Sequence, residues 1–319
     1  MRIKTILNQF LTLLFSSALC SFSVNQSIQA ADLTHYQMSK FSIKASLGYL
    51  GGESNEYVYD TDGTKLSQLN WVLDGAPIFA LNFNSDLFSW LSLGVDLWGT
   101  TDPSAAVMDD YDWLIPSQSR WSDWSHHVNT NLNNASQVDV NVRPWLFQNQ
   151  TFKLGAIIGY QKTELEFLAK GGCFVYDNGF YTGCSDENEP AIGYQQIFEG
   201  GYFGFTSKYL MNHIELDATL KVSPWVSSSD KDEHYSRHLT FYESGNQSTY
   251  ASLSVTAGYY FTQNIKAFFE GSLTQFTNGK ADTVIDYKYG QDLYYIPDAA
   301  GLGHHNYVVA LGVQYSNND

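Results

Sequence analysis

The chain has 319 residues and a formal net charge of −16, a surplus of acid that repels nucleic acid and attracts cationic partners. After the first 30 residues no segment approaches the ~18 uninterrupted apolar residues that a membrane helix requires, which excludes a helical membrane protein. Aromatic residues make up 16% of the chain and charged residues only 16%, which favours the interfacial girdles of a membrane barrel, with a soluble β-sandwich as the alternative on composition alone.

Residues 1–30 are typical of a cleaved signal peptide. Arg2 and Lys4 give a positive start, an apolar stretch follows, and Ala30 ends a run of small residues. Lipid attachment at Cys20 is a weaker alternative, because Leu19 stands where a small residue is wanted. Cleavage would leave residues 31–319 as a single β domain, with 33 acidic and 15 basic side chains and a formal charge of −18.

Apolar and polar residues alternate with a period of two in many segments of the mature chain. The clearest is 213–221, where apolar residues fill the even positions and polar residues the odd ones; similar patterns occur at 41–50, 91–97, 138–143, 253–261 and 307–315. A strand with one wholly polar and one wholly apolar face fits a barrel wall with lipid outside and water inside.

The connections between these segments alternate in length. Tight turns are predicted at 84–86, 148–150, 209–212 and 263–264, and long polar stretches at 52–65, 100–132, 171–190, 228–248 and 277–303. Five long and four short connections predict ten strands in an antiparallel, up-and-down transmembrane β-barrel with long extracellular loops. All five long stretches would then lie at one end of the barrel.

Two cysteines remain after loss of the leader, Cys173 and Cys184. An exported protein passes through an oxidising compartment, so we expect a disulfide between them.

Two pairs of functional residues stand in the second and fourth long stretches. They are Asp110 with Asp112, and Asp232 with His234. Residues i and i+2 of an extended chain point to the same side. Each pair can therefore aim both side chains into one space, and two carboxylates facing a carboxylate-oriented imidazole are able to hold and activate a water molecule.

Around these pairs the chain resembles the omptin family of outer-membrane endopeptidases. The matching stretches are 107–113, 121–123 and 228–235, with further agreement at 67–71, 191–194 and 257–260, and the resemblance extends from about residue 45 to residue 315. It implies a ten-stranded barrel in the bacterial outer membrane, with an active site that faces the cell exterior. It also implies catalysis by an Asp–Asp couple, Asp110 and Asp112, opposite an Asp–His couple, Asp232 and His234.

The resemblance further implies cleavage at basic residues. Glu56 and Asp230 match the family's carboxylates for the side chain before the scissile bond, and Asp123 matches a groove carboxylate for the next substrate residue. His127, Met108 and Ile192 fall in matching positions and are expected to have auxiliary roles. The expected partners are cationic peptides or proteins and outer-membrane lipids, with no nucleic acid, and the expected state is a monomer. No metal or cofactor is expected.

The family is activated by lipopolysaccharide, which binds a basic cluster on the outer wall. Where that motif carries glutamate and then arginine, this chain has Lys162 and Glu164, and a second arginine position is Ile197. A phosphate clamp built from Glu164 and Ile197 would be poor. Lipopolysaccharide therefore remains a doubtful activator here.

Two alternatives stay open at this point. Ser125 beside His126 and His127 invites a serine-protease hypothesis, but no nucleophile elbow surrounds it. A non-catalytic barrel, acting as an adhesin or a small porin-like protein, would keep the scaffold without the chemistry. All four expected catalytic residues are present, which favours the enzyme.

Overall fold

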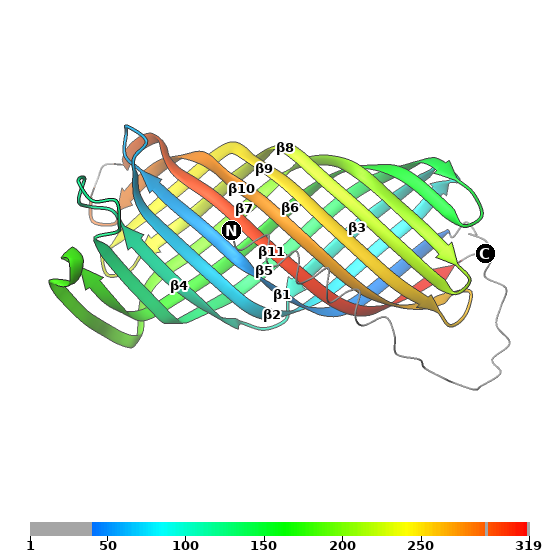
Figure 1. Ribbon diagram of the computed structural model, residues 1–319, viewed down its shortest axis with the longest axis horizontal. Helices are drawn as coiled ribbons and strands as arrows, with labels where there is room; N and C mark the ends of the chain where they lie inside the picture. Colours follow the sequence, from blue (N-terminus) through cyan, green and yellow to red (C-terminus); the bar gives the residue numbers. More distant parts are fainter. Residues whose placement is uncertain (1–39, 291–292, 318–319) are drawn as a thin grey trace. The chain divides into compact units, whose positions relative to one another are not determined.

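The computed structural model describes residues 40–290 and 293–317; the predicted signal peptide at 1–30 lies outside this part of the chain. Eleven strands make up nearly all of it (Figure 1): β1 (Phe41–Tyr59), β2 (Lys65–Phe88), β3 (Leu91–Thr100), β4 (Ser104–Asp112), β5 (Asp123–Gln148), β6 (Phe152–Tyr176), β7 (Tyr181–Met211), β8 (Ile214–His234), β9 (Leu239–Tyr260), β10 (Ile265–Tyr287) and β11 (Leu293–Asn317). A single 3-10 turn, η1 (Asp177–Gly179), interrupts the described strands. No helix in these residues is long and apolar enough to cross a membrane.

The strands form one closed antiparallel barrel. Apart from β3 and β4, each strand pairs with its sequence neighbours, and β1 pairs with both β2 and β11, which closes the ring. β3 and β4 both lie between β2 and β5, one after the other along the wall. The eleven strands therefore occupy ten wall positions, as the alternating connections predicted, and the break at 101–103 divides one of them.

The connections alternate between the two ends of the barrel. The site end carries the connections at 60–64, 113–122, 177–180 and 235–238 and the described residues 288–290, and the turn end carries those at 89–90, 149–151, 212–213 and 261–264. Most of each predicted long loop is paired strand, which extends the wall at the site end. The turn predicted at 84–86 is wrong: Asp86 pairs with Ser92 and accepts a hydrogen bond from its Oγ at 2.6 Å, so β2 continues to Phe88.

The outer wall carries an apolar band. Its exposed side chains come from neighbouring strands and include Leu47, Val138, Val140, Phe205, Leu216, Leu220, Leu311 and Val313. Exposed apolar side chains on alternate residues are what lipid contact requires. On β8, Asp232 follows Leu220 by twelve residues, roughly 40 Å along the strand, so the predicted catalytic residues lie well beyond this band.

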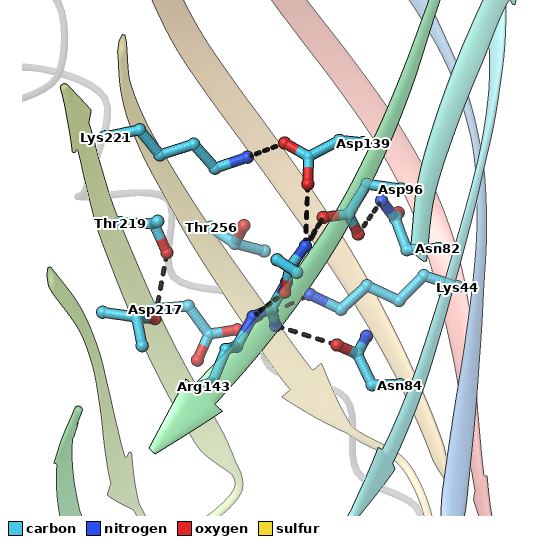
Figure 2. A network of polar contacts seen from close by, with 12 residues as sticks. Lys44, Asn82, Asn84, Asp96, Asp139, Arg143, Asp217, Thr219, Lys221 and Thr256 are labelled. Atoms are coloured by element: carbon cyan, nitrogen blue, oxygen red, sulfur yellow. Dashed lines mark hydrogen bonds and ion pairs between the residues drawn. The ribbon is translucent and has the colours of Figure 1, made fainter. Parts of the chain in front are cut away.

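The lumen at the level of the apolar band is filled by charged and polar side chains (Figure 2). Lys221 binds the fully buried Asp139 at 2.7 Å, and Arg143 binds Asp96 at 3.3 Å. Lys44 also lies 3.6 Å from Asp217 across the interior. Side chains that fill a small barrel argue against a wide pore.

Cys173 and Cys184 are joined by a disulfide, as expected for an exported chain. They stand directly opposite each other in the β6–β7 hairpin. The disulfide therefore cross-links two strands that are already paired by backbone hydrogen bonds, near the tip of the β6–β7 hairpin.

Candidate active site

His234 and Asp232 form a buried pair on β8. His234 Nε2 lies 2.7 Å from Asp232 Oδ2, and the two residues are 8% and 1% exposed. The ring of Phe241, on β9, packs edge-on against the imidazole with centroids 5.5 Å apart. Burial lowers the pKa of His234, but the charge and hydrogen bond of Asp232 outweigh it and leave the pKa above its usual value.

Asp110 and Asp112 lie on β4, on the same face of the strand as predicted. Ser67, on the adjacent strand β2, donates a hydrogen bond from Oγ to Asp110 Oδ1 at 3.1 Å. Burial and the neighbouring charge of Asp112 raise the pKa of Asp110 to about 7. The pKa of Asp112 is also raised, first by burial and then by Asp123. This arrangement lets one carboxyl of the pair keep a proton near neutral pH.

The structure brings the two pairs together. β4 and β8 are not neighbours in the sheet, and the two pairs face each other from separate parts of the wall at the site end. They are close enough to influence each other: the positive charge of His234 lowers the pKa of Asp110, and Asp110 raises that of His234. The second oxygen of Asp232, Oδ1, is buried without a hydrogen-bond partner among the described residues.

Beside the two pairs lies a cluster of three buried carboxylates. Glu56, on β1, and Asp230, on β8, were predicted; Glu243, on β9, was missed. One carboxylate oxygen from each lies within 4.8 Å of the others, and the residues are 1%, 7% and 2% exposed. Burial and mutual repulsion raise the pKa of Glu56 and Asp230 well above normal, and burial raises that of Glu243 to about 8.

Neighbouring hydroxyl groups hold two of these carboxylates. Tyr194 donates its hydroxyl to Asp230 Oδ2 at 3.0 Å, and Thr283 donates to Glu243 Oε1 at 3.0 Å. The Tyr194 ring stacks on the fully buried Trp71, with centroids 5.0 Å apart and planes 3° from parallel. The stacking of Tyr194 on Trp71 therefore holds the hydroxyl that bonds Asp230 in place. A cationic group or a hard metal ion is the kind of ligand that three converging carboxylates attract.

Asp123, predicted to contact substrate, lies at the start of β5 and pairs with Asp112 across the strands. Both of its oxygens are already hydrogen-bonded. Ser122 Oγ donates to Oδ2 at 2.5 Å, and the backbone N–H of Asp177 donates to Oδ1 at 3.1 Å. The bond from Asp177 ties the β6–β7 hairpin to the rim of the site.

The predicted auxiliary residues surround the site without joining the carboxylates. Met108 and Ile192 belong to the buried apolar cluster beneath it, and Ile192 pairs with His234 in the sheet. His127 Nε2 lies 3.0 Å from Ser125 Oγ. The ring packs against Gly172, where an added Cβ would lie 2.5 Å from it and where φ is +124°.

The serine-protease hypothesis finds a Ser125–His127 contact but no triad. The nearby carboxylate of Asp109 bonds to His126 instead, with Oδ1 2.8 Å from Nδ1. A Ser–His pair without an orienting acid lacks the third element of that chemistry.

The wall position expected to bind lipopolysaccharide is acidic. Glu164 pairs with Ile197 in the sheet, and its carboxylate binds Lys162 Nζ at 3.2 Å and Gln195 Nε2 at 2.6 Å. The Glu164 side chain is thus engaged with its neighbours on the wall.

Residues 37–317 match the Omptin family. The chain is 40% identical over 277 residues to a plasminogen activator of Yersinia pestis, covering 86% of this chain and 89% of the relative. It is 36% identical over 280 residues to protease 7 of Escherichia coli K12, covering 85% and 88%. The crystal structure of outer membrane protease OmpT from Escherichia coli superposes with a TM-score of 0.84 at 35% identity, covering 86% of this chain and 96% of that one. The chain therefore belongs to the omptin family and is an outer-membrane protease.

Proposed function

We propose that this protease is an endopeptidase that cleaves beside lysine or arginine, using water activated between the Asp232–His234 and Asp110–Asp112 couples. The observation that carries the proposal is the 2.7 Å contact between His234 and Asp232, in electrostatic reach of Asp110 on the opposite wall. The active site would face the cell exterior, at the end of the barrel away from the short turns.

His234 acts as the general base in this scheme. Its bond to Asp232 fixes the tautomer, and the buried carboxylate stabilises the imidazolium that forms when a water molecule loses its proton. The base must be neutral to accept that proton. Activity should therefore rise with pH through the raised pKa of His234.

Asp110 and Asp112 hold the water from the other side. With a pKa of about 7, Asp110 is about half protonated at pH 7, and the protonated form can donate a hydrogen bond to the oxyanion of the tetrahedral intermediate. His234 then returns its proton to the leaving amine. The bonds balance without a covalent intermediate and without a metal or cofactor.

Substrate selection rests on charge. In this scheme Glu56 and Asp230, which converge in one buried cluster, would bind the basic side chain before the scissile bond, and Asp123 would attract the next residue from the rim. Formation of charge-assisted hydrogen bonds to buried carboxylates makes such a pocket specific for cations. Because one relative is named a plasminogen activator, plasminogen is a candidate substrate alongside cationic peptides.

We further propose that the protein acts as a monomer among outer-membrane lipids and does not bind nucleic acid. The acid-rich wall around Glu164 supports weak or altered activation by lipopolysaccharide.

A peptide-library cleavage assay on refolded protein, with and without lipopolysaccharide, tests the proposed function. We expect cleavage confined to peptide bonds that follow lysine or arginine. Equal cleavage after neutral residues would contradict the role of Glu56 and Asp230. Absence of any cleavage under both conditions would contradict the whole proposal.

A further inference from the structure

The carboxylate cluster presents three free acceptor atoms. Glu56 Oε2, Asp230 Oδ1 and Glu243 Oε2 are buried and have no hydrogen-bond partner among the described residues. The other oxygens of Asp230 and Glu243 are bonded by Tyr194 and Thr283. Buried polar atoms are nearly always bonded in native proteins, so three orphaned oxygens in one place indicate a ligand that supplies donors.

Glu243 adds a third buried carboxylate to the two that were predicted. It stands directly opposite Asp230 in the β8–β9 ladder, and Glu56 reaches the cluster from β1. Like charges directly opposite each other in a sheet repel, and burial makes the repulsion stronger, so these carboxyls ionise together only when a cation is present; without one, burial and repulsion raise their pKa values and they hold protons. A cation that bonds all three carboxylates would relieve both the repulsion and the missing hydrogen bonds.

The number of unbonded oxygens and the spacing of the three carboxylates suit a primary ammonium. An ammonium has three N–H donors that point in tetrahedral directions. Three acceptors at about 2.8 Å along those directions lie roughly 4.6 Å apart. The three carboxylates offer oxygens within 4.8 Å of one another, so one ammonium nitrogen can bond all of them.

A guanidinium suits the same oxygens less well. Its strongest pairing with a carboxylate is bidentate, with two parallel N–H groups on both oxygens of one carboxylate. The hydroxyls of Tyr194 and Thr283 already bond one oxygen of Asp230 and one of Glu243, so a bidentate fork on either carboxylate would share that oxygen with the hydroxyl, whereas the other oxygen of each is unbonded. Single acceptors on separate carboxylates favour a compact point charge over a planar fork.

We infer that Glu243 is a specificity-determining residue, which converts the basic-residue pocket into one that prefers lysine over arginine before the scissile bond. This inference rests on the proposed function of the same pocket. Glu243 supplies the third acceptor; with Glu56 and Asp230 alone, the pocket would have two free oxygens for an ammonium that has three donors.

Two peptides that differ only in lysine or arginine before the scissile bond test the inference. The kcat/KM of each is measured for the wild type, Glu243→Gln and the matched control Glu189→Gln, with a chelator present. Glu189 lies on the exposed part of the β6–β7 hairpin, remote from the cluster in the ladder. We expect the wild type and the control to favour the lysine peptide at least about tenfold, the range of one charge-assisted hydrogen bond. Glu243→Gln should bring the ratio close to one, chiefly by raising KM for the lysine peptide.

Equal ratios in the wild type and Glu243→Gln, or a wild-type preference for arginine, would overturn the inference while leaving the proposed function intact. If the wild type cleaves neither peptide, the proposed function fails. The cation preference of the pocket can then still be tested by ligand binding. In that case n-butylamine should raise the melting temperature of the wild type more than n-propylguanidine does, and Glu243→Gln should lose the difference. If n-butylamine leaves the melting temperature unchanged, or raises it equally in the wild type and Glu243→Gln, the inferred ammonium site is wrong.

Discussion

Ser67 Oγ donates a hydrogen bond to Asp110 Oδ1 at 3.1 Å, from the strand beside the one that carries the aspartate pair. This bond favours the charged form of Asp110 and opposes the effects of burial and of Asp112, which favour the protonated form. The protonation state of the pair near neutral pH is therefore set by a balance that single substitutions can shift.

Removing this hydrogen bond should move the alkaline limb of the pH–activity profile. Ser67→Ala is expected to raise the pKa of Asp110 above about 7, so that the pair keeps its proton to higher pH and the loss of kcat/KM on the alkaline side begins later. Asp112→Asn should move that limb to lower pH, because it removes a neighbouring negative charge. Full kcat/KM profiles of both variants measure the shifts. Limbs that stay in place would mean that Asp110 does not control this ionisation.

The carboxylate pocket should govern substrate affinity more than the chemical step. We expect Glu56→Gln and Asp230→Asn each to lower kcat/KM for a basic peptide at least about tenfold, since each removes a charge-assisted hydrogen bond to the substrate cation. Steady-state kinetics on peptides with lysine, arginine or norleucine before the scissile bond test this. An equal loss for the norleucine peptide would show a structural defect instead of a lost cation site.

Glu243 should make the fold less stable as pH rises. Its pKa is raised by burial from 4.5 to about 8, so the folded protein holds a proton that the unfolded chain releases above about pH 4.5. The contribution of Glu243 to the free energy of unfolding is then greatest below pH 4.5 and falls through the window up to about pH 8. Glu243→Gln is expected to melt at least about 2 °C higher than the wild type at pH 8, with a smaller difference at pH 5. Thermal unfolding in detergent at both pH values measures this, and a gap that is larger at pH 5 would have the wrong sign.

The outer wall should gain a contact for a lipopolysaccharide phosphate when the negative charge of Glu164 is replaced by a positive one. Glu164→Arg places a guanidinium where Glu164 now binds Lys162 and Gln195, and it is expected to increase activity or affinity in lipopolysaccharide. Titration of refolded variant and wild type with lipopolysaccharide, followed by peptide cleavage, gives both quantities. Unchanged curves would remove the argument that this wall position limits activation.

Much of the fold could be predicted from two sequence patterns: the alternation of apolar and polar residues, and the alternation of short and long connections. The alternation at 138–143 survives as strand β5 with its valines on the outer wall, and alternating connections give ten wall positions. The turn at 84–86 was misplaced because Asn, Ser and Asp favour turns. In the structure these three residues belong to β2 and pair with β3. Local propensity does not reveal where a ladder continues.

The two functional pairs were predictable because each depends only on a spacing of two residues within a strand. Glu243 was not, because its position opposite Asp230 depends on the register set by the connection at 235–238. A polar hairpin gives no signal that separates a buried acid from an exposed one. Its neighbour on the same face, Phe241, was the available hint, since an aromatic side chain in that polar stretch indicates a packed interior.

In the proposed mechanism the Asp232–His234 couple activates the water that cleaves the peptide bond. The most direct test is the kcat/KM of refolded Asp232→Ala and His234→Ala on a peptide with paired basic residues, with folding checked by heat-modifiable electrophoretic mobility. We expect a loss of at least about a thousandfold for both variants while the barrel still forms. Undiminished turnover by both would contradict it and place the chemistry elsewhere in the barrel.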